Sequence, residues 1–303
     1  MDTGKGIEMG SATARHDTND NPDGNDDRHD RGLAFDVGTL LERRRALQLL
    51  SGAAVFAIGA CAAGQDGTTA TTTSGTSSTT AAADASAMAG SSTTPSSEVP
   101  DETGGPYPGD GSNGPNVLDD SGIVRPDITT SYATSTTRAQ GVPLTVNLTV
   151  TDTAKGYAAL AGAAVYLWHC DRDGNYSLYS QGLENENYLR GVQETSAAGT
   201  VTFTTVFPGA YSGRWPHIHF EVYASVEDAT SSGPIVKTSQ IALPRAACEQ
   251  AYAASGYERS VENLQGSSLT SDNVFGDDGG VHQLATVTGD AASGFVANLT
   301  IGV

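Results

Sequence analysis

The segment "RWPHIHFEV", residues 214–222, places two histidines one residue apart inside an otherwise apolar, β-forming run. Successive side chains of a strand point to opposite faces, so His217 and His219 are predicted to share one face. Their side chains would emerge about 6–7 Å apart along the strand, close enough for both to bind one metal ion. The pattern alone is a weak metal signal, because two half-exposed surface histidines would produce it equally well.

The rest of the sequence lacks the common metal and nucleophile motifs. It contains no H-E-x-x-H and no Cys2His2 spacing, and His169 and His282 stand apart from the pair. The segment "DRDGNY", from Asp171, starts like a calcium loop, but its twelfth position is Gly182 where that loop requires glutamate. G-x-S-x-G and P-loop motifs are also missing. A zinc protease, a calcium loop and a nucleotide-binding loop are therefore unsupported.

The remaining candidate ligands near the histidines are tyrosines, namely Tyr176, Tyr179 and Tyr211. Phenolate oxygens are hard anionic donors, and together with two imidazoles they would suit a hard trivalent ion such as Fe(III). The charge of the ion would also lower the phenol pKa far below its usual value of about 10. The chain has 11 tyrosines, however, and most tyrosines in a β-sandwich only pack. Spacing alone does not choose among them.

The elements that would position these side chains are short strands with period-two alternation. Leu144, Val146, Leu148 and Val150 alternate with polar residues, which predicts a half-buried strand, and "AVYLW" at 164–168 has the continuous apolar character of a buried one. Further strands are predicted within 199–209, 217–226 and 235–243, and a terminal hairpin turns around residues 290–293. The one predicted helix covers 245–255. We predict an all-β, immunoglobulin- or prealbumin-like sandwich with long loops, among them 171–199.

The N-terminal third of the chain cannot build a core. Residues 1–39 are rich in Asp, Gly, Asn and Arg and are predicted to be disordered. Residues 40–64 contain three arginines and then an apolar run, 46–60, that is shorter than the ~20 residues of a membrane span. This pattern indicates a signal segment. The Ser/Thr/Ala-rich residues 65–98 are predicted to form a flexible linker, which leaves 99–303 as the folded domain.

Two short motifs refine the expected location. Arg44 and Arg45 resemble a twin-arginine export signal, and "IGAC", ending at Cys61, resembles a bacterial lipobox. We expect an exported bacterial protein, either a cell-surface lipoprotein or a secreted one, whose contact with the membrane is a lipid on Cys61. The alternative is a plain signal peptide, or an amphipathic leader with a chance cysteine.

Charge and cysteine content bound the partners further. With 16 Lys and Arg against 35 Asp and Glu, the net charge is −19, so nucleic-acid binding is excluded. If Cys61 is lipidated, Cys170 and Cys248 remain as a pair in an oxidising compartment. We expect a disulfide between them, although their distance in space does not follow from sequence.

Several motifs, taken in order, resemble the intradiol ring-cleavage dioxygenases, the family of the catechol and protocatechuate dioxygenases. They are "ETGGPYP" at 102–108, "GAAVYLWHCDRDGNYS", "YLRGVQETSAAGTVTFTTVFPGAYSGRWPHIHFEV" and a later "TSQ". The resemblance covers about residues 100 to 300. It departs from the family in two respects, because the helical N-terminal region that dimerises the catechol enzymes is replaced by the linker and the loop from Tyr211 to His217 is shorter.

The resemblance implies a role for six residues. It makes Tyr176, in Gly-Asn-Tyr, and Tyr211, in Pro-Gly-Ala-Tyr, ligands of a non-haem Fe(III), together with His217 and His219. Arg214, three residues before the first histidine, and Gln240, in "TSQ", would lie beside the substrate.

The implied activity is O2-dependent cleavage of a catechol between its two hydroxyl-bearing carbons, which gives a muconate-type diacid. In this scheme Tyr211 is the labile ligand and takes a substrate proton, and Arg214 stabilises the developing negative charge. Two alternatives stay open. One is an exported module that binds iron or catecholate without turnover, and the other is a metal-free structural domain of the cell surface. Ring substituents and oligomeric state are left open.

Overall fold

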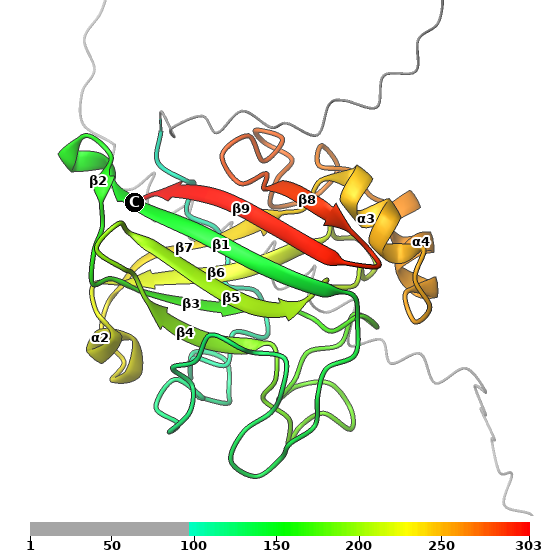
Figure 1. Cartoon of the computed structure of the whole chain (residues 1–303), viewed down its shortest axis with the longest axis horizontal. Coiled ribbons are helices and arrows are strands. Elements are labelled where there is room, and N and C mark those ends of the chain that lie inside the picture. The colour runs from blue at the N-terminus through cyan, green and yellow to red at the C-terminus, as the bar shows by residue number, and fades with distance from the viewer. Residues whose placement is uncertain (1–96) are drawn as a thin grey trace, which may run out of the picture.

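The computed structural model describes residues 97–303 (Figure 1). The predicted extension 1–39, the signal segment 40–64 with Cys61 and nearly all of the linker 65–98 lie outside the described residues. Across residues 97–303, none of the helices is both long enough and apolar enough to cross a membrane.

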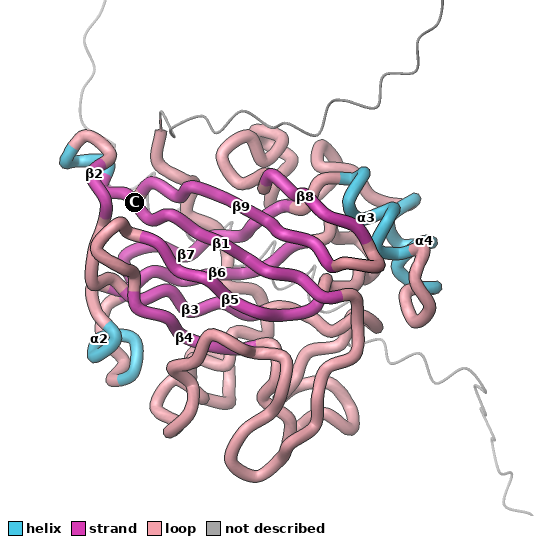
Figure 2. Tube along the Cα trace, viewed as in Figure 1, coloured by secondary structure: helices cyan, strands magenta, loops and turns pink. Residues whose placement is uncertain are grey.

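Two β-sheets form the body of the described chain (Figures 1 and 2). One contains β1 (Pro143–Asp152), β2 (Ala158–Ala159), β5 (Thr200–Val206), β8 (Thr286–Asp290) and β9 (Gly294–Gly302). Its path runs β2-β1-β9-β8, with β5 also paired to β1, and only the β1–β9 pair is parallel. The other contains β3 (Ala164–Trp168), β4 (Arg190–Glu194), β6 (His217–Tyr223) and β7 (Ile235–Ala242), in the order β4-β3-β6-β7, all antiparallel.

The sheets pack face to face through one hydrophobic core. The predicted apolar face of β1 meets alternate residues of β3 and β6, and both sets belong to one cluster of buried side chains. These include Leu144, Val146, Leu148 and Val150 from β1, with Val165, Leu167, Ile218, Phe220 and Val222 opposite. Burial of such apolar area is the main favourable term in folding. The described chain is therefore mostly β, with two packed sheets, in agreement with the predicted sandwich.

The outer face of the four-stranded sheet is buried as well, because loops cover it. Tyr166 and Trp168 of β3 point to this side and pack in a second cluster with Tyr176 and with Val117 and Leu118 of the N-terminal loops. His219, paired with Trp168 across the strands, stacks its ring on the indole at 5.0 Å between ring centroids. The two histidines thus lie between the sheet and its loop cover.

Short helices close the ends of the sandwich (Figure 1). They are η1 (Thr153–Lys155), α2 (Val226–Thr230), α3 (Arg245–Tyr252) and α4 (Glu258–Gln265). Helix α3 confirms the predicted helix but ends at Tyr252, short of residue 255, and its residues Ala247, Cys248, Ala251 and Tyr252 belong to the main core. Helix α4 was not predicted, because only Ser260 and Leu264 of its eight residues are buried and an apolar stripe is lacking.

Two expectations were wrong. The segment predicted as loop, 171–199, contains strand β4, which begins with a buried Arg190 rather than an apolar residue. Oxygens of Pro108, Tyr166 and Ser177 accept hydrogen bonds from its guanidinium, which allows the charge to be buried. A strand that buries a charged residue lacks the apolar pattern by which strands are predicted. The expected disulfide is also absent, since Cys170 and Cys248 are both free. Their thiols instead donate to the carbonyls of Gly209 and Leu243, respectively.

Candidate metal centre

His217 and His219 are held by the central part of the four-stranded sheet. Strand β6 pairs with β3 on one side and β7 on the other, and His219 lies opposite both Trp168 and Gln240. Both imidazoles are buried, each with 2% of the residue exposed. Backbone hydrogen bonds on both sides of β6 therefore fix the backbone positions from which the two imidazole side chains project.

The protonation of His217 follows from its hydrogen bond. Its Nδ1 lies 2.6 Å from the carbonyl oxygen of Trp215, and because a carbonyl only accepts, Nδ1 carries the proton. Burial, and then the nearby Arg214 charge, lowers the pKa of His217 to about 3, so the ring is neutral and Nε2 has a free lone pair. Burial and the neighbouring His217 likewise hold the pKa of His219 well below its usual value. Two neutral imidazoles are the form that metals bind.

Tyr176 is presented by the loop that follows β3. The Asp171 carboxylate accepts the backbone N–H groups of Asp173 and Asn175 at 2.9 Å each, which forms a tight turn. Gly174 occupies the turn with a φ of 86°, a conformation that favours glycine. The Tyr176 N–H then donates to Ser180 Oγ at 2.9 Å, and the side chain is almost fully buried. The turn therefore sends this phenol inward.

Tyr211 is presented by a second loop, which helix α4 holds in place. Ser260 accepts the N–H of the preceding residue, Ala210, at 2.9 Å, and Asn263 donates to the Ala210 carbonyl at 2.8 Å. Tyr211 itself is only half-buried. Its position thus depends on two side chains from an element some fifty residues further along the chain.

The four predicted ligand atoms converge. The phenol oxygens of Tyr176 and Tyr211 lie 3.5 Å apart, Tyr211 Oη is 3.1 Å from His217 Nε2, and the two histidine Nε2 atoms are 3.1 Å apart. A metal ion with bonds of about 2 Å places neighbouring donor atoms about 3 Å apart, so this donor set fits one. Within residues 97–303, no three His, Cys, Asp or Glu side chains form such a group. The phenols are needed to complete the site.

The phenol of Tyr176 would be neutral without a cation. Burial, and then the neighbouring Tyr211, raises the pKa of Tyr176 well above its usual value. A trivalent ion at the meeting point would reverse this preference, because its charge stabilises the phenolate. A buried pair of neutral imidazoles and a buried phenol therefore match the donor set of a hard cation better than they match an empty polar pocket.

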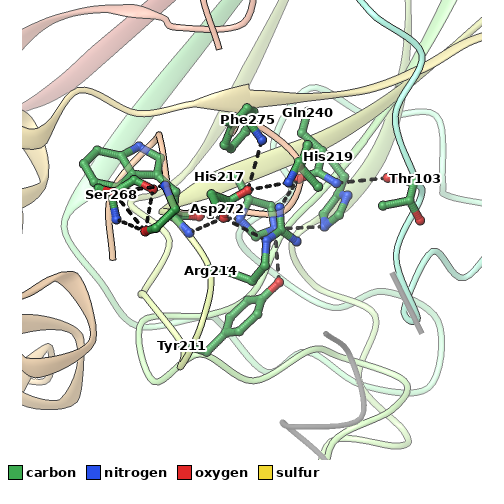
Figure 3. Close-up of polar contacts among 12 residues, drawn as sticks. Thr103, Tyr211, Arg214, His217, His219, Gln240, Ser268, Asp272 and Phe275 are labelled. Carbon is green, nitrogen blue, oxygen red and sulfur yellow. Dashed lines mark hydrogen bonds and ion pairs between the residues drawn. The ribbon is translucent and has the colours of Figure 1, made fainter. Parts of the chain in front are cut away.

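Arg214 and Gln240 join the same group (Figure 3). Nη2 of Arg214 donates to the Gln240 side-chain oxygen at 2.6 Å, and Gln240 Nε2 donates to the Thr103 carbonyl at 3.0 Å. The Arg214 guanidinium also forms a buried ion pair with Asp272, with Nε 3.0 Å from Oδ2. All six predicted site residues are thus brought together, from β6, β7 and two loops.

Several other residues were missed or lie elsewhere. Asp272 lies in none of the motifs named above, and Thr103, although it lies in "ETGGPYP", was given no role; only the folded structure connects them to Arg214 and Gln240. Tyr179, considered as a ligand, instead accepts the N–H of Gly109 at 2.9 Å. His169 is buried, and its Nε2 lies 2.7 Å from the Thr205 hydroxyl, so this nitrogen already has a hydrogen-bond partner outside the candidate site.

Comparisons with known proteins find similarity to dioxygenases. A family model described as "Dioxygenase" matches residues 123–230. An intradiol ring-cleavage dioxygenase from Tetranychus urticae is 24% identical over 60% of this chain and 87% of its own, with a TM-score of 0.49. A second dioxygenase crystal structure is 25% identical over 60% and 87%, with a TM-score of 0.50. The dioxygenase domain of a carbohydrate-binding fusion protein from Streptomyces sp. SirexAA-E is 26% identical over 68% and 98%, with a TM-score of 0.44. No curated protein matches the chain.

Proposed function

We propose that this chain, which resembles the intradiol ring-cleavage dioxygenases in sequence and in fold, is a non-haem Fe(III) dioxygenase acting on a catechol-type aromatic. The reaction cleaves the ring between the two hydroxyl-bearing carbons and places both atoms of O2 in a muconate-type diacid. One observation carries the proposal: two phenol oxygens and two imidazole nitrogens meet at successive distances of 3.5, 3.1 and 3.1 Å beside a buried arginine.

Four residues would hold the iron, namely Tyr176, Tyr211, His217 and His219. A bound Fe(III) supplies the positive charge that makes both phenols and both catechol hydroxyls acidic at neutral pH. The chain contributes a neutral His217 whose proton stays on Nδ1 through the Trp215 carbonyl, so that Nε2 faces the ion. It also excludes water, because the histidines and Tyr176 are buried.

Tyr211 is the candidate for moving a proton. It is half-buried and loop-borne, whereas the other three ligands are buried. Its Oη is therefore the one of the four best placed to leave and take the proton of an incoming catechol hydroxyl. Arg214 remains charged throughout and would stabilise negative charge as it develops on the substrate ring. Gln240 would hold the Arg214 guanidinium in place through its side-chain oxygen.

The proposal includes export from a bacterial cytoplasm, as a lipoprotein or a secreted protein, on the pattern of residues 40–64. The substrate would then be an extracellular catechol. The net charge of −19 argues against nucleic acid as a partner.

A visible absorption spectrum of the purified full chain, loaded with Fe(III), tests the proposal. We expect a tyrosinate-to-iron band that shifts when catechol is added without oxygen, followed by stoichiometric oxygen uptake when air is admitted. A colourless loaded protein would contradict the iron site. A band that shifts without oxygen uptake would leave an iron- or catecholate-binding module and contradict the enzyme.

A further inference from the structure

Asp272 joins two parts of the site through a single carboxylate (Figure 3). Its Oδ2 accepts from Arg214 Nε at 3.0 Å and from the backbone N–H of Trp215 at 2.7 Å. Its Oδ1 accepts the N–H groups of Val274 and Phe275 at 2.8 and 3.1 Å. Each oxygen therefore has two donors, and the side chain is buried.

The Trp215 backbone extends this contact to His217, one of the candidate metal ligands. Its N–H donates to Asp272, and its carbonyl accepts the Nδ1 proton of His217 at 2.6 Å. Asp272 is thus one hydrogen bond from Arg214 and two from His217. When a carboxylate orients a metal-binding histidine from outside the ligand shell, its mutation typically lowers metal affinity or activity by about 10–100-fold.

Arg190 offers a comparison within the same molecule. It is as deeply buried as Arg214, yet in residues 97–303 only uncharged oxygens, from Pro108, Tyr166 and Ser177, satisfy its guanidinium. Burying an arginine in this fold therefore does not require a carboxylate. At Arg214 a carboxylate is present, and it contacts Nε while Nη2 donates to Gln240.

We propose that Asp272 is a positioning residue that holds the Arg214 guanidinium beside the substrate. This role rests on the proposed dioxygenase function. In this role Asp272 acts through Arg214 and not on the reacting atoms.

A purely structural role is the competing explanation, because Asp272 also closes the turn at Val274 and Phe275. The two explanations separate in a double-mutant cycle with Arg214. If Asp272 is only structural, its replacement lowers stability, and any effect on kcat is the same with and without Arg214. A positioning aspartate loses most of its effect on kcat once Arg214 is gone.

The experiment compares Asp272→Asn, Arg214→Gln and the double variant with the unmodified, iron-loaded full chain. We expect Asp272→Asn to keep its iron and its tyrosinate band, to bind catechol anaerobically within about 3-fold of the unmodified chain, and to lose about 10–100-fold in kcat. In the Arg214→Gln background the same change should cost less than about 3-fold. Glu186→Gln is the control, since it removes one negative charge from a carboxylate held by three hydroxyls and should leave kcat unchanged.

Asp272→Glu keeps the charge but displaces the carboxylate, and it replaces Asp272→Asn if that variant does not fold. Its kcat should also fall by about 10-fold or more with iron retained. An unchanged kcat in the Asp272 variant, or an equal loss with and without Arg214, would overturn the positioning role while the unmodified chain still consumes oxygen. An unmodified chain that takes up no oxygen would instead overturn the proposed function, and the positioning role with it.

Discussion

The two halves of the candidate metal centre are built differently. The histidine half comes from one strand, where His217 and His219 are fixed by pairing on both sides and buried against Trp168. The tyrosine half comes from two loops, one held by the Asp171 turn and the other by Ser260 of helix α4. A sheet position is set by many backbone hydrogen bonds, whereas a loop position is set by a few side chains.

This difference assigns a task to each half. Under the proposed function, the strand would hold ligands that have to stay, and the loop that carries Tyr211 would hold the ligand whose protonation or position changes during the reaction. Tyr211 is the extreme case, because it is half-buried while the other three ligands are buried. Changes in the histidine half should therefore act on iron retention, and changes in the tyrosine half should act on turnover or on local stability.

The largest effect is expected from His217→Ala. Removing a strand-borne nitrogen leaves three donors, so iron affinity should fall by more than about 100-fold, measured as iron retained after dialysis against a competing chelator. His282→Ala is the control, since that histidine contacts the Ser97 hydroxyl away from the site and its loss should leave iron content unchanged. Full iron retention in His217→Ala would break the division between the halves.

Tyr211→Phe should keep iron and lose turnover. The remaining three ligands still hold the ion, but the proton acceptor is gone, so kcat should fall by about 100-fold or more, followed by oxygen uptake. Tyr157→Phe, in the turn between η1 and β2, should behave as the unmodified chain. If Tyr211→Phe instead lost iron as completely as His217→Ala, the tyrosine would be a permanent ligand and not a labile one.

The tyrosine loop should also lose stability as pH rises. Burial raises the pKa of Asp171 to about 6, so the folded chain holds this proton more tightly than the unfolded chain, whose carboxyl titrates near 4. The stabilisation is therefore complete below about pH 4 and lost by about pH 6. Asp171→Asn has no proton to lose, so its unfolding free energy relative to the parent should rise by about 2–3 kcal/mol between pH 4 and 7.

Urea unfolding of the iron-free proteins at several pH values measures this difference. Asp290→Asn serves as the control, because hydrogen bonds from Ser293 and Ala292 lower the pKa of Asp290 and the difference should change with the opposite sign. A flat difference for Asp171→Asn would show that folding does not raise the pKa of this carboxyl.

The smallest effect is expected from Gly174→Ala, which crowds the two tyrosine loops. The new methyl would stand 3.3 Å from Tyr211 Cβ, and a φ of 86° would cost about 1–2 kcal/mol with any side chain. Gly162→Ala has a similar φ, 78°, and open space around the new methyl, so it carries the strain without the contact. Both variants should lose stability on denaturation, but only Gly174→Ala should shift the tyrosinate band and lower kcat by a few-fold.

Much of the scaffold was predictable because it depends on short-range pattern. Alternation in 144–150 and the apolar run in 164–168 each report which faces are buried, and both strands formed as predicted. Strand β4 was not predicted because its buried Arg190 is charged and is held by hydrogen bonds. Helix α4 was not predicted because most of its surface is solvated. The predicted disulfide was wrong because the distance between two thiols far apart in sequence is set by the tertiary structure.

By itself, the sequence determined that His217 and His219 share a face, that the chain is mostly β, and, through the order of its motifs, which tyrosines accompany the histidines. The tertiary structure decided that loops bury the outer face of the sheet, that α4 places Tyr211, and that Asp272, 58 residues beyond Arg214, is its partner. Side-chain direction repeats every two residues along a strand, so sequence contains it. Contacts between residues far apart along the chain are set by how sheets, helices and loops pack, so only the folded molecule contains those.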